Sequence, residues 1–126
     1  MRVKNPALGE GFEYIEVGGD VPVYADFAVR IDGDSMEPYI RTGSTIYVHR
    51  DPLSNGDVGI FFCDGDMLCK QYYRDELGNV WLLSLNRDRA DADKTIEADS
   101  GLTLVCYGRV ILPHPLNLAV PEDELP

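Results

Sequence analysis

Apolar side chains fall into short runs along the chain, separated by turns rich in Gly, Asp and Asn. The runs at 27–31 and 44–48 alternate between apolar and polar positions, as expected for strands with one buried face. Four further runs are more continuous in their apolar character, and they lie at 58–63, 67–73, 80–85 and 102–111. Only 36–41 and 90–94 have room for a turn of helix. The pattern predicts a mainly β fold of several short, mostly antiparallel strands with minimal helix.

Glycines mark where the predicted strands turn or change spacing. Asp64-Gly65 lies between two β-prone runs, and such a dipeptide is a strong signal for a tight hairpin. A second hairpin loop is predicted at 74–79. Gly108 lies inside the last apolar run, where a glycine often marks a β-bulge.

The chain divides into three parts by composition. Residues 1–24 are rich in Gly and Glu and show little periodicity apart from a strand-like run at 15–17, so we predict a linker remnant or arm there. The regular pattern occupies 25–112, which predicts one domain. Residues 113–126 form an acidic, proline-rich tail, which we predict to be loose.

Eleven basic residues against twenty-two acidic residues give the chain a net charge of −11. Affinity for nucleic acid depends mainly on clustered Lys and Arg, so we do not expect this chain to bind DNA by itself. No apolar run approaches the roughly 18 residues of a membrane-spanning helix, and the N-terminus lacks the apolar core of a signal peptide. We therefore expect a cytoplasmic protein without a membrane partner.

The three cysteines, Cys63, Cys69 and Cys106, lie in apolar runs and form no Cys-x-x-Cys pair. We interpret them as buried, reduced thiols. A zinc site needs closely spaced ligands, and the two histidines, His49 and His114, do not provide them. We expect neither a metal nor another cofactor.

Ser35 lies in the run Gly33-Asp34-Ser35-Met36-Glu37-Pro38. One interpretation is a turn residue whose hydroxyl is satisfied by nearby backbone. The other is a nucleophile, because Gly33 permits a tight turn and Pro38 restricts the residue before it to extended conformations. Such a turn would direct adjacent backbone N–H groups one way, as an oxyanion hole requires.

Lys70 lies among apolar and aromatic residues, on the same predicted strand face as Leu68 and Tyr72. It is either a solvated lysine on an edge strand, where it guards against aggregation, or a buried one. Burial disfavours the ammonium form and lowers the pKa, which lets a lysine accept a serine proton near neutral pH. The competing base would be a histidine, but His49 precedes a turn, His114 lies between prolines, and neither has a natural path to Ser35.

The segment 25–38 resembles the nucleophile segment of LexA-type and phage-repressor-type self-cleaving serine peptidases. The resemblance covers roughly 20–112, through the segments 43–48, 55–58, 84–86 and 107–111 and through Lys70 on its strand. It implies a LexA/signal-peptidase-like β domain. Ser35 would then be the nucleophile and Lys70 the general base, and the backbone N–H groups of Asp34 and Ser35 would hold the oxyanion.

Proteins of this family cut their own linker after a small residue, usually at Ala-Gly, when they meet the RecA filament formed on damaged DNA. The resemblance therefore implies the C-terminal autoproteolytic and dimerisation domain of a transcriptional regulator of an SOS-type response. Its expected partners are a second copy of the chain and the RecA filament as co-protease. DNA would be contacted only through a helix-turn-helix domain that this chain lacks, and 1–24 would be the arm that carries the cleavage site.

Two features depart from the family pattern. Many relatives carry a hydroxyl residue two positions before the lysine, where this chain has Leu68, which removes one hydrogen bond to the lysine and adds desolvation. Residues 1–24 contain no Ala-Gly. The spacing usual in relatives puts the scissile bond near Met1 or just upstream of it, with Ala7-Leu8 as the second candidate.

Two other functions stay open on this evidence. A UmuD-like accessory protein, which is processed and then binds a translesion polymerase, would also lack a DNA-binding domain. A non-catalytic module would keep the fold for dimerisation or ligand sensing. A signal-peptidase-like enzyme shares a Ser-Met-x-Pro style of motif, but the missing membrane anchor argues against it.

Overall fold

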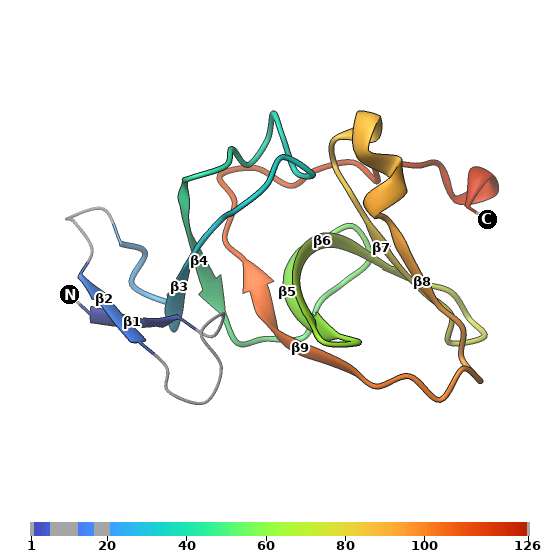
Figure 1. Ribbon diagram of the computed structural model, residues 1–126, viewed down its shortest axis with the longest axis horizontal. Helices are drawn as coiled ribbons and strands as arrows, with labels where there is room; N and C mark the ends of the chain where they lie inside the picture. The colour runs from blue at the N-terminus through green and yellow to red at the C-terminus, as the bar shows by residue number, and fades with distance from the viewer. Residues whose placement is uncertain (1, 6–12, 17–20, 126) are drawn as a thin grey trace.

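The computed structural model describes residues 2–5, 13–16 and 21–125, and in them nine strands form one sheet (Figure 1). The strands are β1 (Arg2–Asn5), β2 (Glu13–Glu16), β3 (Phe27–Arg30), β4 (Thr45–His49), β5 (Val58–Cys63), β6 (Asp66–Arg74), β7 (Val80–Leu83), β8 (Lys94–Ile96) and β9 (Leu104–Val110). Their order across the sheet is β2-β1-β3-β4-β9-β5-β6-β7-β8. Every neighbouring pair is antiparallel except β1 and β3. The predicted mainly β fold is therefore confirmed.

The six strands predicted from the sequence are β3, β4, β5, β6, β7 and β9, with ends that differ by at most two residues. The helical turn expected at 90–94 lies slightly earlier, as the 3-10 helix η2 (Arg87–Ala92), and a second short helix, η3 (Glu122–Glu124), lies near the C-terminus. Lys94 instead begins β8, because this short segment completes the ladder of β7.

A β-bulge lies where β5 meets β9. Ile60 is opposite Gly108 and Phe61 is opposite Cys106, so Tyr107 is the extra residue on β9. Gly108 has φ 147°, and a Cβ there would lie 2.6 Å from the carbonyl oxygen of His49. No other residue fits this approach of the two backbones, which confirms the bulge predicted at Gly108.

The hairpin of β5 and β6 is closed by Asp64-Gly65, with φ values of 50° and 86°. Positive φ at both central residues is typical of a type I′ turn, which matches the twist of the strands it joins. The predicted hairpin is confirmed. Its register places Gly59 opposite Lys70, and the next ladder places Gln71 opposite Leu83.

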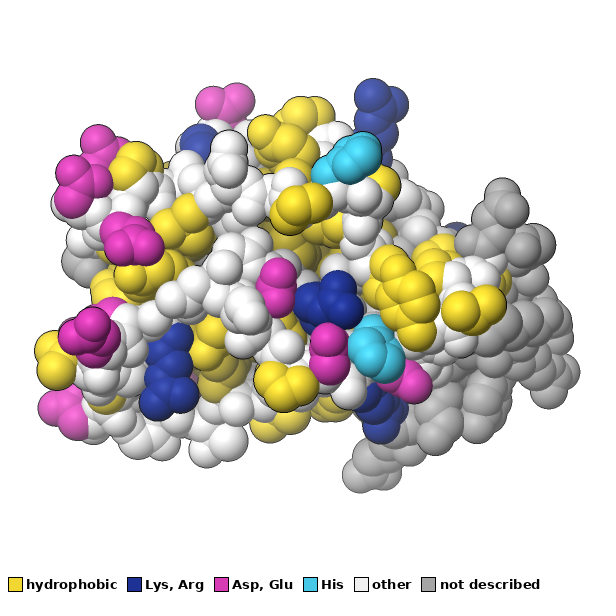
Figure 2. All heavy atoms as spheres, turned by 180° about the vertical axis from the view of Figure 1, so that it is seen from behind, with side chains coloured by type: hydrophobic (Ala, Val, Ile, Leu, Met, Phe, Trp, Pro, Cys, Tyr) yellow, Lys and Arg dark blue, Asp and Glu magenta, His cyan; other side chains and the backbone are white. Residues whose placement is uncertain are grey.

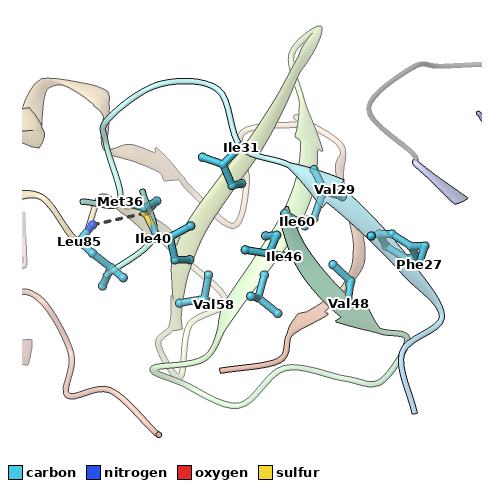
Figure 3. Close-up of a cluster of buried hydrophobic side chains, with 12 residues drawn as sticks. Phe27, Val29, Ile31, Met36, Ile40, Ile46, Val48, Val58, Ile60 and Leu85 are labelled. Atoms are coloured by element: carbon cyan, nitrogen blue, oxygen red, sulfur yellow. Dashed lines mark hydrogen bonds between the residues drawn. The ribbon is translucent and has the colours of Figure 1, made fainter. Parts of the chain in front are cut away.

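Two clusters of buried apolar residues lie on the curved sheet. The larger one gathers side chains from β3, β4, β5 and the turn after β3 (Figure 3). Met36 and Ile40 attach that turn to the cluster, and they are only 2% and 3% exposed. The smaller cluster is formed by Phe61, Cys63, Leu82 and Ile96. The turn that carries Ser35 is therefore anchored in the main core.

The chain ends on either side of the predicted domain are joined to it. β1 and β2 form an antiparallel pair, and β1 meets β3 through Lys4 opposite Phe27. At the C-terminal end, the tail is held by Gln71, which is fully buried. Its Nε2 donates to the Asn117 carbonyl at 2.9 Å, and its Oε1 accepts from Ala119 N–H at 2.7 Å. This part of the tail is tied to the sheet and is not loose as predicted, because the buried side-chain amide of Gln71 forms hydrogen bonds with backbone groups of the tail.

The cysteines are all free, but they are not all buried. Cys63 is buried, Cys69 is half-buried and Cys106 is exposed. The prediction of burial was wrong for Cys106, which lies in a part of β9 where the adjacent Val105 is exposed as well. On the face of the molecule seen in Figure 2, the Lys and Arg side chains lie apart from one another among acidic and apolar groups.

Candidate active site

Ser35 lies in a tight turn directly after β3. Gly33 has φ 103°, a left-handed conformation that favours glycine, and its N–H donates to Thr42 Oγ1 at 3.1 Å. Glu37 N–H donates to the Asp34 carbonyl at 3.1 Å, which closes the turn around Ser35. The turn is therefore fixed by local hydrogen bonds and by the buried Met36 that follows the serine.

Lys70 reaches this turn from β6. Its side chain is only 4% exposed, and Nζ lies 2.8 Å from Ser35 Oγ although 35 residues separate the two in sequence. β6 has β5 on one side and β7 on the other, so Lys70 is not an edge-strand lysine in solvent. The structure thus brings Ser35 and Lys70 together and supports the buried interpretation of the lysine.

Burial lowers the pKa of Lys70 below its ordinary value of 10.5, because the desolvated ammonium form is disfavoured. The nearby cation of Arg89 acts in the same direction, while the carboxylates of Asp93 and Asp91 act in the opposite one. Burial also raises the pKa of the neighbouring Cys69 to about 12, so this thiol stays protonated near neutral pH. Ser35 is therefore the nucleophile candidate, beside a lysine whose pKa is lowered by burial.

A second hydroxyl contacts the lysine. Ser84, which directly follows β7 and is fully buried, places its Oγ 3.1 Å from Lys70 Nζ. Its own N–H donates to Asp93 Oδ1 at 2.7 Å, and the same carboxylate is paired with Arg87 at 2.8 Å. Sequence reasoning noted 84–86 only as family-like and gave Ser84 no role, since a contact across strands depends on their register.

The predicted oxyanion donors lie at the same turn. Among the hydrogen bonds of the described residues, none uses the N–H group of Asp34 or of Ser35. The Asp34 carboxylate, in contrast, is paired with the guanidinium of Arg89 on η2. Within the described residues both N–H groups thus lack a hydrogen-bond partner, and they lie beside a carboxylate whose charge is compensated by Arg89.

A cavity of about 280 Å³ opens next to the two side chains. Apart from Ser35 and Lys70 its walls are mostly apolar, with contributions from Val29, Ile31, Met36, Ile60, Met67 and Leu68. In the described part of the chain, β1 pairs with β3 only at Phe27, so the rest of that β3 edge carries no strand partner. A larger hollow of about 780 Å³ lies elsewhere, along Arg50, Phe61 and Arg74, and contains neither Ser35 nor Lys70.

The other residues considered from the sequence lie away from this cavity. His49 is on β4, 3.2 Å from the carboxylate of Asp26, and His114 is exposed in the tail. Ala7-Leu8 falls outside the described residues. Within 2–5, 13–16 and 21–125, no group of three or more metal-binding side chains comes together. In that same part of the chain, no helix has the length and apolar character to cross a membrane.

Comparison with known proteins agrees with this geometry. No curated protein gives a significant match to the chain. A protein-family model described as Peptidase S24-like matches residues 4–111, a range that contains β3 to β9 together with Ser35, Lys70 and Ser84. Because the match covers most of the chain and the whole of the cavity described above, the chain belongs to the Peptidase S24-like family.

Proposed function

We propose that this chain is a self-cleaving serine peptidase domain that uses a Ser35–Lys70 dyad. The observation that carries the proposal is the 2.8 Å distance between Lys70 Nζ and Ser35 Oγ, with the lysine buried. A neutral amine at this distance accepts the hydroxyl proton, which activates the serine oxygen. Family membership supports a serine peptidase of the self-cleaving kind.

The reaction has two steps. In the first, Lys70 takes the proton of Ser35 while Oγ bonds to the carbonyl carbon of the scissile peptide, and the N–H groups of Asp34 and Ser35 stabilise the oxyanion. Lys70 then passes the proton to the departing amine, which leaves an ester on Ser35. In the second step water attacks this ester, with Lys70 again as base, and releases the new C-terminus. No cofactor takes part.

The substrate is an extended segment of polypeptide. The part of the β3 edge that has no strand partner among the described residues leads to Ser35 and borders the apolar cavity, so a peptide added along this edge would bring a carbonyl to the serine. Self-cleavage holds such a segment at a high effective concentration, which compensates for weak binding.

At the level of biology, we propose the autoproteolytic and dimerisation domain of a LexA-like or phage-repressor-like regulator. A homodimer and the RecA filament as co-protease belong to this proposal as what the resemblance of 25–38 and Lys70 to self-cleaving repressors implies. Sedimentation of the purified chain tests the dimer. Addition of activated RecA to the protein, with cleavage followed over time, tests the co-protease.

The dyad itself is tested by intact-mass spectrometry between about pH 7 and pH 10. Full-length wild-type protein, with any residues that precede Met1, is expected to give two fragments whose masses sum to the parent mass plus water, while its Ser35→Ala and Lys70→Ala variants stay intact. A fluorophosphonate probe tests the serine without need of the cleavage site, and it should label wild type but not Ser35→Ala. If wild type is neither cut nor labelled, the chain is a non-catalytic module of the same fold.

A further inference from the structure

One residue holds two consecutive carbonyl groups of the serine turn. The backbone N–H of Asn86 donates to the Ser35 carbonyl at 2.9 Å, and its side-chain Nδ2 donates to the Asp34 carbonyl at 3.0 Å. Asn86 lies outside this turn, 52 residues beyond Asp34 and just after the strand that supplies Ser84. The turn is therefore held from the opposite side of the site.

The second of these bonds fixes an N–H direction. The Asp34 carbonyl and the Ser35 N–H belong to one planar trans peptide unit, so they point in opposite directions. A donor that holds the carbonyl on one side aims the N–H to the other side. Glu37 N–H also donates to this carbonyl, at 3.1 Å, but Glu37 belongs to the turn and moves with it. Asn86 supplies the restraint that comes from outside.

The orientation of the Asn86 amide is itself determined. Its Oδ1 accepts from Asp88 N–H at 3.1 Å, which makes Asn86 the N-cap of η2. With the oxygen used in this way, Nδ2 faces the Asp34 carbonyl. From the same helix, Arg89 pairs with the Asp34 carboxylate. Main chain and side chain of Asp34 are thus both held by η2 and its cap.

We propose that Asn86 is a positioning residue for the oxyanion hole, which aims the Ser35 N–H at the substrate oxygen through the Asp34 carbonyl. The inference rests on the proposed Ser-Lys peptidase function. An asparagine suits both tasks because it has an acceptor for the cap and a donor for the carbonyl. Aspartate keeps only the acceptor, and serine keeps the cap but is too short to reach Asp34.

The test is the rate of labelling of Ser35 by a fluorophosphonate probe, followed by intact mass across pH. In this reaction the Oγ–P bond forms, the P–F bond breaks, the serine proton passes to Lys70 and fluoride leaves. The phosphoryl oxygen occupies the place of the oxyanion, so the rate reports the aim of the N–H groups. Removal of an oxyanion donor costs about 10²–10³ in rate, and a misdirected one is expected to cost about tenfold or more.

Asn86→Ser and Asn86→Asp should both lower the plateau rate by this factor and leave the pH midpoint unchanged. Because each keeps an N-cap acceptor, the free energy of unfolding should change little. Thr95→Ala, at an exposed position of β8, is the matched control with wild-type labelling.

Three results would overturn the inference. A wild-type rate in either folded variant shows that the Asp34 carbonyl needs no external donor. A shifted pH midpoint shows that Asn86 acts through Lys70 and not through the oxyanion hole. If the wild-type protein itself is not labelled, both the proposed Ser-Lys function and this inference are wrong. This result can be told apart from the other two because it is seen before any substitution at Asn86. If one variant does not fold, the other decides.

Discussion

The hydroxyl of Ser84 lies 3.1 Å from Nζ of Lys70, across the ladder of β6 and β7. The register pairs Gln71 with Leu83, so the next residues outward on the two strands, Lys70 and Ser84, face each other. On β6 itself, the residue two positions before the lysine is Leu68, which carries no polar group. The neighbouring strand therefore supplies the polar group that the lysine's own strand lacks.

Replacement of Ser84 by Ala is expected to slow the reaction of Ser35 by about tenfold, because a buried amine without its second partner is less well oriented. The fluorophosphonate labelling rate at fixed pH measures the effect. The double variant Leu68→Thr, Ser84→Ala returns a hydroxyl to the lysine from its own strand and should recover part of the rate. Unchanged labelling of Ser84→Ala would exclude a role for this hydroxyl.

The pH dependence of the reaction should follow the lowered pKa of Lys70. Since burial favours the neutral amine, the rate is expected to rise with pH and to reach half its plateau below the ordinary lysine value of 10.5. Lys70→Arg should be inactive over the whole range, because a guanidinium keeps its proton. A wild-type midpoint at or above 10.5 would contradict a desolvated base.

Stability should also depend on the protonation of Lys70. The folded state has the lower pKa, so between that value and 10.5 it binds fewer protons than the unfolded state, and stability rises with pH through this window. The stability of the Lys70→Met variant should not change with pH in this way, because methionine has no group that binds a proton. We expect Met to stabilise the protein at pH values below the folded pKa and the gain to shrink as pH approaches 10.5. Urea unfolding of both proteins across this range measures the difference, and a constant difference would contradict the prediction.

Gln71→Met should loosen the C-terminal tail. The substitution keeps the length of the side chain but leaves the carbonyls of Gly56 and Asn117 and the N–H of Ala119 without their partner. A loss of about 2 to 4 kcal/mol is expected in the free energy of unfolding. Limited proteolysis after residue 115 should become faster. Tyr72→Phe, on the same strand, removes only a hydroxyl that has no hydrogen-bond partner among the described residues, and it serves as the control with a loss below about 1 kcal/mol.

The two residues that meet at the candidate site, Ser35 and Lys70, could be singled out from the sequence because each has a local signal. Gly33 and Pro38 flank the serine, and apolar neighbours surround the lysine. The strands were visible for the same reason, since each predicted run extends over five residues or more, alternating at 27–31 and 44–48 and more continuously apolar in the other four. β8 has only three residues, which is too short for a period to appear.

The supporting residues could not be predicted in this way. Ser84 and Asn86 act through space, at partners 14 and 52 residues away, and their positions depend on the register of β6 and β7 and on the cap of η2. Gln71 carried no sign of its role, because a glutamine on a strand is usually solvated. The contacts that support the site therefore depend on how distant segments pair. Ser35 and Lys70, in contrast, can be recognised from their neighbours in sequence.

The Asp64-Gly65 turn has a chemical consequence beyond closing a hairpin. Lys70 and Gln71 are consecutive, so their side chains leave β6 on opposite faces, one toward Ser35 and the other toward the tail. A slip of one residue in the pairing would exchange the two faces. Ser35 would then face the amide of Gln71, which does not accept a proton. The ammonium group of Lys70 would lie under the tail, where it has no acceptor for the N–H of Ala119. A two-residue turn thus decides which of two neighbours faces Ser35, and a hairpin that closes out of register would remove the amine from the proposed dyad.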